Sequence, residues 1–164
     1  MQKFLIPFLF MTLLSFAQSK MEMKQLIDSE KFQGTINRID SFPTKFILPR
    51  TVDIWLPSNY SKSKKYSVIY MHDGQMLFDS SITWNKQEWG VDETVTKLMQ
   101  QQKIKDCIVV GIWNGGKSRH PEYFPQKPFE ALSKENQNLV YDAYRSGGQS
   151  IFSGLAISSD NYLK

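Results

Sequence analysis

Two short and almost continuous apolar runs constrain the fold of this chain more than any other feature. Residues 66–71 (YSVIYM) and 106–113 (DCIVVGIW) have the length of strands, and such runs are typical of strands covered on both faces in a parallel sheet. Between them, residues 89–102 have the pattern of an amphipathic helix. Its apolar positions recur at helical spacing: Val91, Val95, Leu98 and Met99. This order predicts a right-handed βαβ unit.

Two further strands are expected before this unit. Residues 31–42 alternate in part, and residues 50–56 alternate apolar side chains with polar or large ones until Pro57 ends the run. We expect these strands to be antiparallel neighbours. The predicted fold class is therefore α/β, with antiparallel strands leading into a parallel βαβ unit. In this prediction the second apolar run, residues 106–113, forms the open edge of the sheet.

The remainder of the chain is less regular. Residues 114–129 contain two glycines and three prolines among several rings, a composition typical of a structured loop over a site. A short helix is predicted around residues 136–144. Another helix is predicted to begin at a Ser-Ser-Asp cap over residues 158–160.

The N-terminus has the pattern of an export signal. Lys3 provides a positive charge, residues 4–16 are almost wholly apolar, and small residues precede Gln18. This run is short for a membrane span, which needs about 20 residues, although an uncleaved anchor is the alternative. The predicted organisation is a signal peptide over residues 1–17 and a single domain over residues 18–164. The mature protein is expected to be periplasmic or extracellular, without stable membrane association.

Charge and cysteine content favour some classes of site over others. The formal charge of +4 comes from 20 Lys and Arg against 16 Asp and Glu, and the basic residues are scattered, which argues against a nucleic-acid partner. The single cysteine, Cys107, lies in an apolar run and is expected to be a buried hydrophobe. No metal or cofactor is predicted, because the side chains of the types that bind metals are not spaced as in a metal-binding motif. These side chains are His72, Asp73, Asp79, Glu88, His120 and Glu122.

Four polar or side-chain-free residues, His-Asp-Gly-Gln at positions 72–75, follow the first apolar run directly. Functional groups collect beyond the carboxyl ends of parallel strands, so this position favours function. Gly74 would let the backbone turn without a Cβ atom and let a ligand approach backbone N–H groups. The alternative is a tight turn in which His72 and Asp73 only satisfy local backbone groups.

Residues 49–79, followed by TWNKQEWGVDETVTKLM, IVVGIWN and RHPEYFP, carry a family resemblance. Over most of residues 36–125 the chain resembles the N-terminal half of the putative esterase family of α/β-hydrolases, which includes enterochelin esterases, feruloyl esterases and S-formylglutathione hydrolases. The resemblance implies a small-molecule ester substrate and an oxyanion-hole N–H from the Gly74 and Gln75 backbone. It also implies candidate substrate-pocket residues, namely His72, Asp73, Asn114, Arg119 and Tyr123.

One motif of this family is missing. No G-x-S-x-G nucleophile motif occurs, and the nearest sequences, at residues 115–119 and 148–152, lack the closing glycine. The triad order of the family is Ser, then Asp or Glu, then His, whereas His72 and His120 both lie upstream of where the serine should come. We therefore interpret the chain as the N-terminal portion of an exported carboxylic-ester hydrolase, inactive by itself. The alternative is a catalytically silent exported domain that binds a ligand or partner through its aromatic loop.

Overall fold

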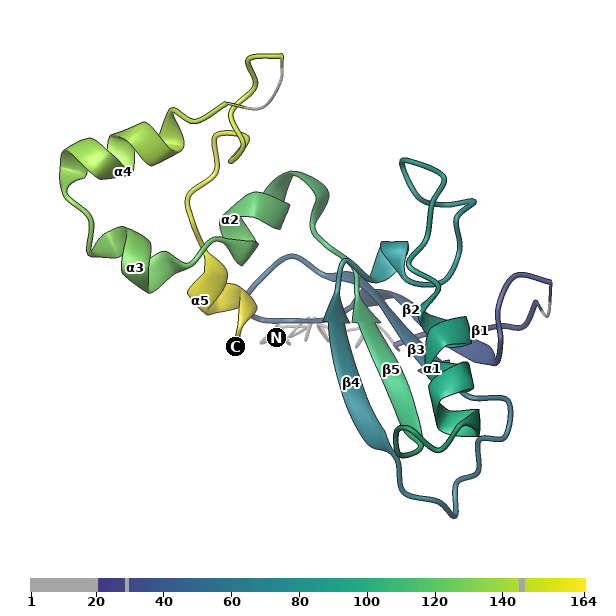
Figure 1. The fold of residues 1–164 in the computed structure, drawn as a ribbon. Helices are drawn as coiled ribbons and strands as arrows, with labels where there is room; N and C mark the ends of the chain where they lie inside the picture. The colour runs from purple at the N-terminus through teal and green to yellow at the C-terminus, as the bar shows by residue number, and fades with distance from the viewer. Residues whose placement is uncertain (1–20, 29, 145–146) are drawn as a thin grey trace, which may run out of the picture.

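The computed structural model describes residues 21–28, 30–144 and 147–164, and it is built around a five-stranded mixed sheet (Figure 1). The strands are ordered β1-β2-β3-β5-β4 across the sheet. Their bounds are Lys24–Leu26 for β1, Thr35–Phe42 for β2, Arg50–Leu56 for β3, Ser67–His72 for β4 and Cys107–Ile112 for β5. The predicted signal peptide, residues 1–17, lies outside the described residues.

The pairing of the strands confirms the predicted fold class. β2 and β3 are antiparallel neighbours, with Ile36 opposite Trp55. β4 and β5 are parallel, with Ile69 opposite Val109, and helix α1 (Val91–Gln100) lies between them in the sequence. β5 also pairs with β3 in the antiparallel direction, so it joins the two halves of the sheet. The result is the predicted antiparallel section that leads into a parallel βαβ unit.

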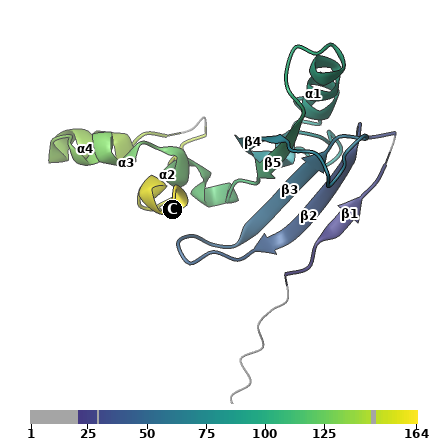
Figure 2. The same ribbon diagram turned by 90° about the horizontal axis from the view of Figure 1, so that it is seen from below.

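The main core lies between α1 and one face of the sheet (Figure 2). Trp55 and Val109 are fully buried, and Val95 of α1 packs in the same cluster. The Trp55 indole N–H donates to the Gln33 carbonyl oxygen at 2.6 Å, so its one polar atom is satisfied inside the core. Cys107 is buried here, as predicted, and burial raises the pKa of its thiol.

The first apolar run does not have the position predicted for it. β4 lies at the edge of the sheet beyond β5, so residues 106–113 contain a central strand rather than the open edge. Val68, Ile69 and Tyr70 are 45%, 37% and 71% exposed. The expectation of a strand covered on both faces was therefore wrong, because the one helix of the βαβ unit packs over β3 and β5 and leaves β4 open to solvent.

Residues 114–129 are helical rather than the predicted loop. The 3₁₀ turn η2 (Gly116–Ser118) leads into α2 (Arg119–Tyr123), and α3 (Gln126–Glu130) follows. Pro121 and Pro128 stand early in these helices, where a missing N–H is tolerated. The predicted helix near residues 136–144 is α4 (Lys134–Tyr141), whose N-cap Ser133 accepts a hydrogen bond from the Asn136 N–H.

The helices after β5 form a second layer beyond the carboxyl ends of β4 and β5 (Figures 1 and 2). A small core of Phe129, Phe152 and Ile157 joins their segments. The last helix is α5 (Ser159–Tyr162), which begins where a helix was predicted. The Ser158 side chain makes no cap hydrogen bond, and the Ser158 backbone N–H donates to the Pro121 carbonyl oxygen of α2. In the described ranges, no helix is long and apolar enough to cross a membrane.

Candidate active site

The chain turns sharply where β4 ends. Asp73 takes the left-handed conformation, with φ 55° and ψ 43°, and the 3₁₀ turn η1 (Gly74–Met76) follows. The Met76 and Leu77 N–H groups donate to the Asp73 and Gly74 carbonyl oxygens. The N–H groups of Gly74 and Gln75 precede these bonds, so the turn itself offers them no acceptor.

Gly74 is needed here for close packing rather than for a left-handed backbone. A Cβ atom at this position would lie 2.6 Å from the Gly111 carbonyl carbon and 2.9 Å from the Ile112 nitrogen of β5. A Cβ atom at Gly111 would in turn lie 2.8 Å from the Leu77 side chain. The two glycines therefore let η1 lie directly on the β5 backbone. The residue that requires the special φ is Asp73, which the sequence did not indicate.

Asp73 connects this turn to the segment after β5. Its carboxylate accepts hydrogen bonds from Arg119 Nε at 2.8 Å, from Arg119 Nη2 at 2.7 Å and from Asn114 Nδ2 at 2.7 Å. Burial acts to raise the pKa of Asp73, but the bonds from Arg119 and Asn114 hold it below its ordinary value. Asp73 is therefore a charged anchor for both neighbours.

Gln75 and Asn114 form a second link between the same two segments. The Asn114 N–H donates to Gln75 Oε1 at 3.2 Å, and the Gly116 N–H donates to Asn114 Oδ1 at 2.9 Å. The Gln75 side chain thus helps to hold the start of the segment after β5. Three of the predicted pocket residues, Asp73, Asn114 and Arg119, meet at one place with Gln75.

The other two predicted pocket residues, His72 and Tyr123, form an aromatic cluster with Tyr162. His72 Nδ1 lies 2.7 Å from the Tyr162 hydroxyl oxygen, and the His72 and Tyr123 rings are 5.1 Å apart. The Arg119 guanidinium lies 5.2 Å from the Tyr123 ring centroid, and burial raises the pKa of the Tyr123 hydroxyl. The cluster joins the end of β4 to α2 and α5.

A buried ion pair fixes α2 against the sheet. Arg50, at the start of β3, donates from Nη1 and Nη2 to the two carboxylate oxygens of Glu122, both at 2.9 Å. The two residues are only 7% and 4% exposed. They are 72 positions apart in the sequence, and no local pattern indicates this pairing.

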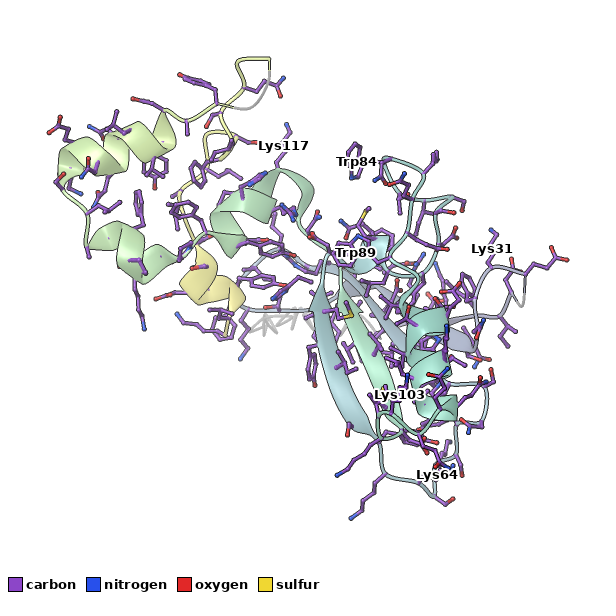
Figure 3. The ribbon with its side chains drawn as sticks, viewed as in Figure 1. Lys31, Lys64, Trp84, Trp89, Lys103 and Lys117 are labelled. Carbon is purple, nitrogen blue, oxygen red and sulfur yellow. The ribbon has the colours of Figure 1, made fainter. Side chains whose placement is uncertain are left out.

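Asp73, Gln75, Asn114 and Arg119 line part of a hollow of about 640 Å³. Two tryptophans of the segment between η1 and α1 line one side, and Figure 3 shows the labelled Trp84 between that segment and α2. The complete lining is Asp73, Gln75, Met76, Ile82, Trp84, Asn85, Trp89, Asn114, Gly116, Arg119 and His120. His72 and Tyr123 do not line it. Trp84 and Trp89 were not among the predicted pocket residues, although two tryptophans in a polar segment are a usable signal.

The site has the parts needed to bind a small molecule and to stabilise a negative charge. Gln75, the Arg119 held by Asp73 and apolar rings line a hollow of ligand size, whereas Gly74 lines a separate, smaller hollow. Among the side chains that the structure describes, no group of three His, Cys, Asp or Glu residues is placed to hold a metal ion.

Comparison with known proteins places the chain in a family. Residues 46–145 match the family model described as "Putative esterase", a span that includes β3, α1, β4, β5 and the site residues. No curated protein and no solved structure gives a significant match. Because the matched residues make up more than half of the chain, the protein belongs to the putative esterase family of esterase-like hydrolases.

Proposed function

We propose that the protein is an exported carboxylic-ester hydrolase and that these 164 residues supply its oxyanion hole and one wall of its substrate pocket. The observation that carries the proposal is the turn at Gly74 and Gln75. Its first N–H groups follow the carboxyl end of a parallel strand, and Gln75 lines the hollow. A substrate carbonyl in the hollow would have its oxygen near Gln75, whose N–H is the donor proposed here.

The chemistry of ester hydrolysis explains why this placement matters. A nucleophile that attacks the ester carbonyl produces a tetrahedral intermediate with a negative oxygen. Fixed N–H donors stabilise that charge, and removal of one such donor typically lowers kcat by about 100-fold to 1,000-fold. Asp73, Asn114 and Arg119 would act as positioning residues, because they hold the turn and the segment after β5 together without supplying a nucleophile.

The nucleophile itself is proposed to come from residues that follow Lys164. The 164 residues contain no G-x-S-x-G motif. The exposed edge of β4 supports this proposal, because Val68, Ile69 and Tyr70 offer apolar surface where a further strand would pair. A strand that paired there in the parallel direction would bring its carboxyl end beside Gly74 and Gln75, where a nucleophile is needed.

The proposed function also includes export of the protein and a class of ligand. The apolar residues 4–16, with small residues before Gln18, support cleavage after position 17 and release into the periplasm or medium. The proposed ligand is a small-molecule ester, and neither nucleic acid nor a stable membrane association is part of the proposal. N-terminal sequencing of the exported product tests the cleavage, and a product that begins at Gln18 is expected.

A silent binding domain is the second candidate, and the observation that favours it is the exposed aromatic wall of the hollow. Such a protein would bind a ligand at Trp84 and Trp89 without chemistry. The two candidates make different predictions about the reading frame. An open frame after Lys164 that encodes G-x-S-x-G after an apolar run is expected for the hydrolase. A stop codon with no downstream frame would favour the binding domain.

The decisive experiment compares two proteins, one made from the whole reading frame and one limited to residues 18–164. The first is expected to hydrolyse p-nitrophenyl esters and to react with a fluorophosphonate probe. The second is expected to do neither, because it has no activated nucleophile. A whole-frame protein that hydrolyses no ester would contradict the proposed function. Fluorophosphonate labelling within residues 18–164 would contradict the proposed place of the nucleophile.

A further inference from the structure

Two loops meet at the amino ends of the parallel strands β4 and β5. They are residues 57–66, which precede β4, and residues 101–106, which precede β5. The Ser67 N–H donates to the Asp106 carbonyl oxygen at 3.0 Å, and Lys64 Nζ lies 3.4 Å from the Asp106 carboxylate. The two loops therefore form one continuous surface, although β4 and α1 separate them in the sequence.

This surface carries an unbalanced positive charge. Its five lysines are all exposed, namely Lys62, Lys64, Lys65, Lys103 and Lys105. Its one acidic residue, Asp106, pairs with Lys64, and in the part of the chain that the structure describes the other four lysines form no ion pair. Five of the 20 basic residues but only one of the 16 acidic residues lie here, which leaves the rest of the chain with 15 of each. The net charge of the chain is therefore concentrated on this lysine surface.

The lysine surface and the hollow of about 640 Å³ lie at opposite ends of the sheet. Asp73 and Asn114, which follow the carboxyl ends of β4 and β5, line the hollow, whereas the lysines lie at the amino ends. Figure 3 shows this separation, with the labelled Lys64 and Lys103 at one end and Trp84 at the other. A partner held by the lysines would leave the hollow accessible.

The shape and composition of the lysine surface favour a broad anionic partner. A hollow of about 210 Å³ lies beside the loops, but its lining includes Pro57, Met99 and Asp106 and none of the five lysines, so they do not enclose a small anion. The surface also contains no arginine, whose planar fork suits paired contacts with a phosphate or a carboxylate. Separate ammonium groups act as point charges, which are attracted to any extended surface of negative potential.

A tyrosine in the first loop fits the same kind of partner. Tyr60 is 41% exposed, and its ring stacks on Tyr66 with the centroids 5.1 Å apart. The Tyr66 hydroxyl accepts a hydrogen bond from the Ser61 N–H at 2.9 Å, which holds the loop that carries three of the lysines. Tyrosine rings are enriched at the interface between lipid and water, where lysines place their charge beside the head groups.

We propose that the lysine surface, residues 57–66 and 101–106, binds the anionic phosphate groups of a phospholipid membrane. Such binding is electrostatic and reversible, in contrast to a stable membrane anchor. It weakens with salt, because the Debye length falls from about 30 Å at 0.01 M to about 3 Å at 1 M. Binding would direct the hollow away from the lipid, and the inference does not rest on ester hydrolysis.

Co-sedimentation with lipid vesicles tests the proposal. The whole-frame protein is used in the form that begins at Gln18, so that the apolar residues 4–16 cannot bind lipid. Vesicles of phosphatidylcholine are compared with vesicles of equal parts phosphatidylcholine and phosphatidylglycerol, which are anionic. We expect binding to the anionic vesicles at about 0.01 M salt, little binding to the neutral vesicles, and release at about 1 M salt.

Two double variants that lose the same charge separate the lysine surface from the net charge. Lys65→Ala with Lys103→Ala should lower the partition coefficient on the anionic vesicles by about tenfold. Lys117→Ala with Lys127→Ala, in the helices after β5, is the control and should change it by less than about threefold. All four side chains are exposed, and unchanged melting temperatures would show that both variants are folded.

Five results would overturn the inference. The first three are no binding to the anionic vesicles at low salt, equal binding to the two kinds of vesicle, and an equal loss of binding in the two double variants. The fourth is release by inorganic phosphate at an ionic strength where sodium chloride does not release the protein, which would indicate a small-anion site. The fifth is tighter binding to a short DNA duplex than to the anionic vesicles, which would indicate a nucleic-acid partner.

Discussion

Arg119 donates two hydrogen bonds to the carboxylate of Asp73, at 2.8 Å from Nε and 2.7 Å from Nη2, across 46 positions of the sequence. The paired geometry matches the planar fork of a guanidinium to the two oxygens of a carboxylate. Asp73 is also the residue with a left-handed backbone at the end of β4. This one pair therefore joins the turn at Gly74 and Gln75 to the start of α2.

The first prediction concerns this pair. Arg119→Lys keeps the charge but replaces the fork by one ammonium group, so Asp73 loses one of its two guanidinium bonds. We expect kcat of the whole-frame protein to fall by about tenfold or more, because the turn is no longer held in position. The melting temperature should change little, since Arg119 is partly exposed. Lys117→Ala, in the adjacent turn, is the control and should retain full activity. Equal kcat in both variants would contradict the positioning role.

The second prediction concerns Gly74. Gly74→Ala places a Cβ atom against the β5 backbone at 2.6 Å, so η1 must move. We expect a loss of about 1–3 kcal/mol in the free energy of unfolding, as for other overpacked positions. We also expect a fall in kcat of about 100-fold if an N–H donor moves away from the oxyanion. Gly154→Asn is the control, because its Cβ atom meets nothing within 4 Å, it lies outside the hollow and asparagine tolerates the left-handed region.

The third prediction concerns the buried pair of Arg50 and Glu122. Glu122→Gln leaves the Arg50 guanidinium buried without a charged partner, so we expect a loss of about 3 kcal/mol or more in stability. Asp40→Asn breaks the pair between Lys24 and Asp40, which are both more than half exposed, and should cost well under about 1 kcal/mol. Urea unfolding of both variants measures the difference. A loss of similar size in the two variants would show that burial does not decide the outcome.

The fourth prediction concerns pH and Asp92. This carboxyl is fully buried at the start of α1, where it accepts a hydrogen bond from the Gln33 N–H at 2.6 Å. Burial and the neighbouring Glu93 raise the pKa of Asp92 to about 7. Its pKa in the unfolded chain is about 4, so the folded state binds the extra proton between these values. The stability of the folded state therefore falls as the pH rises from about 4 to about 7.

Asp92→Asn removes this titration and is nearly isosteric. The variant and the unmodified protein should have similar stability near pH 4, and the variant should be more stable by about 1 kcal/mol or more at pH 8. Asp106→Asn, at an exposed position, should follow the unmodified protein at both values. Urea unfolding of the three proteins at pH 4 and pH 8 measures these differences. A stability gain for Asp92→Asn that is equal at both pH values would contradict the assignment.

The fifth prediction concerns the edge strand β4. Residues 18–164 expressed by themselves should aggregate, because an exposed apolar strand edge pairs readily with other chains. Tyr70→Lys places a charge on this edge and should increase the soluble yield. Tyr144→Lys, at an exposed tyrosine outside the five-stranded sheet, should not. A soluble monomer of the unmodified segment with a sharp cooperative melt would contradict this prediction.

Local pattern was enough to predict most of the strands and the helix between them. The apolar runs of β4 and β5 and the 3.6-residue spacing of α1 are properties of neighbouring residues, and the sequence therefore determined the βαβ unit and the parallel pair. It also determined that polar residues follow β4 where a site is expected. Strand β1 was missed, because three residues with little burial carry no periodicity.

Contacts between distant residues decided what the local pattern left open. Which run lies at the sheet edge depends on β5 pairing with both β3 and β4, and the composition of β4 does not contain that information. The close approach of Gly74 to Gly111 and the pairing of Asp73 with Arg119 likewise join segments that only the folded chain brings together. The sequence thus determined the elements and the place of the site, whereas the tertiary structure decided which side chains meet there, because packing and hydrogen bonds act through space rather than along the chain.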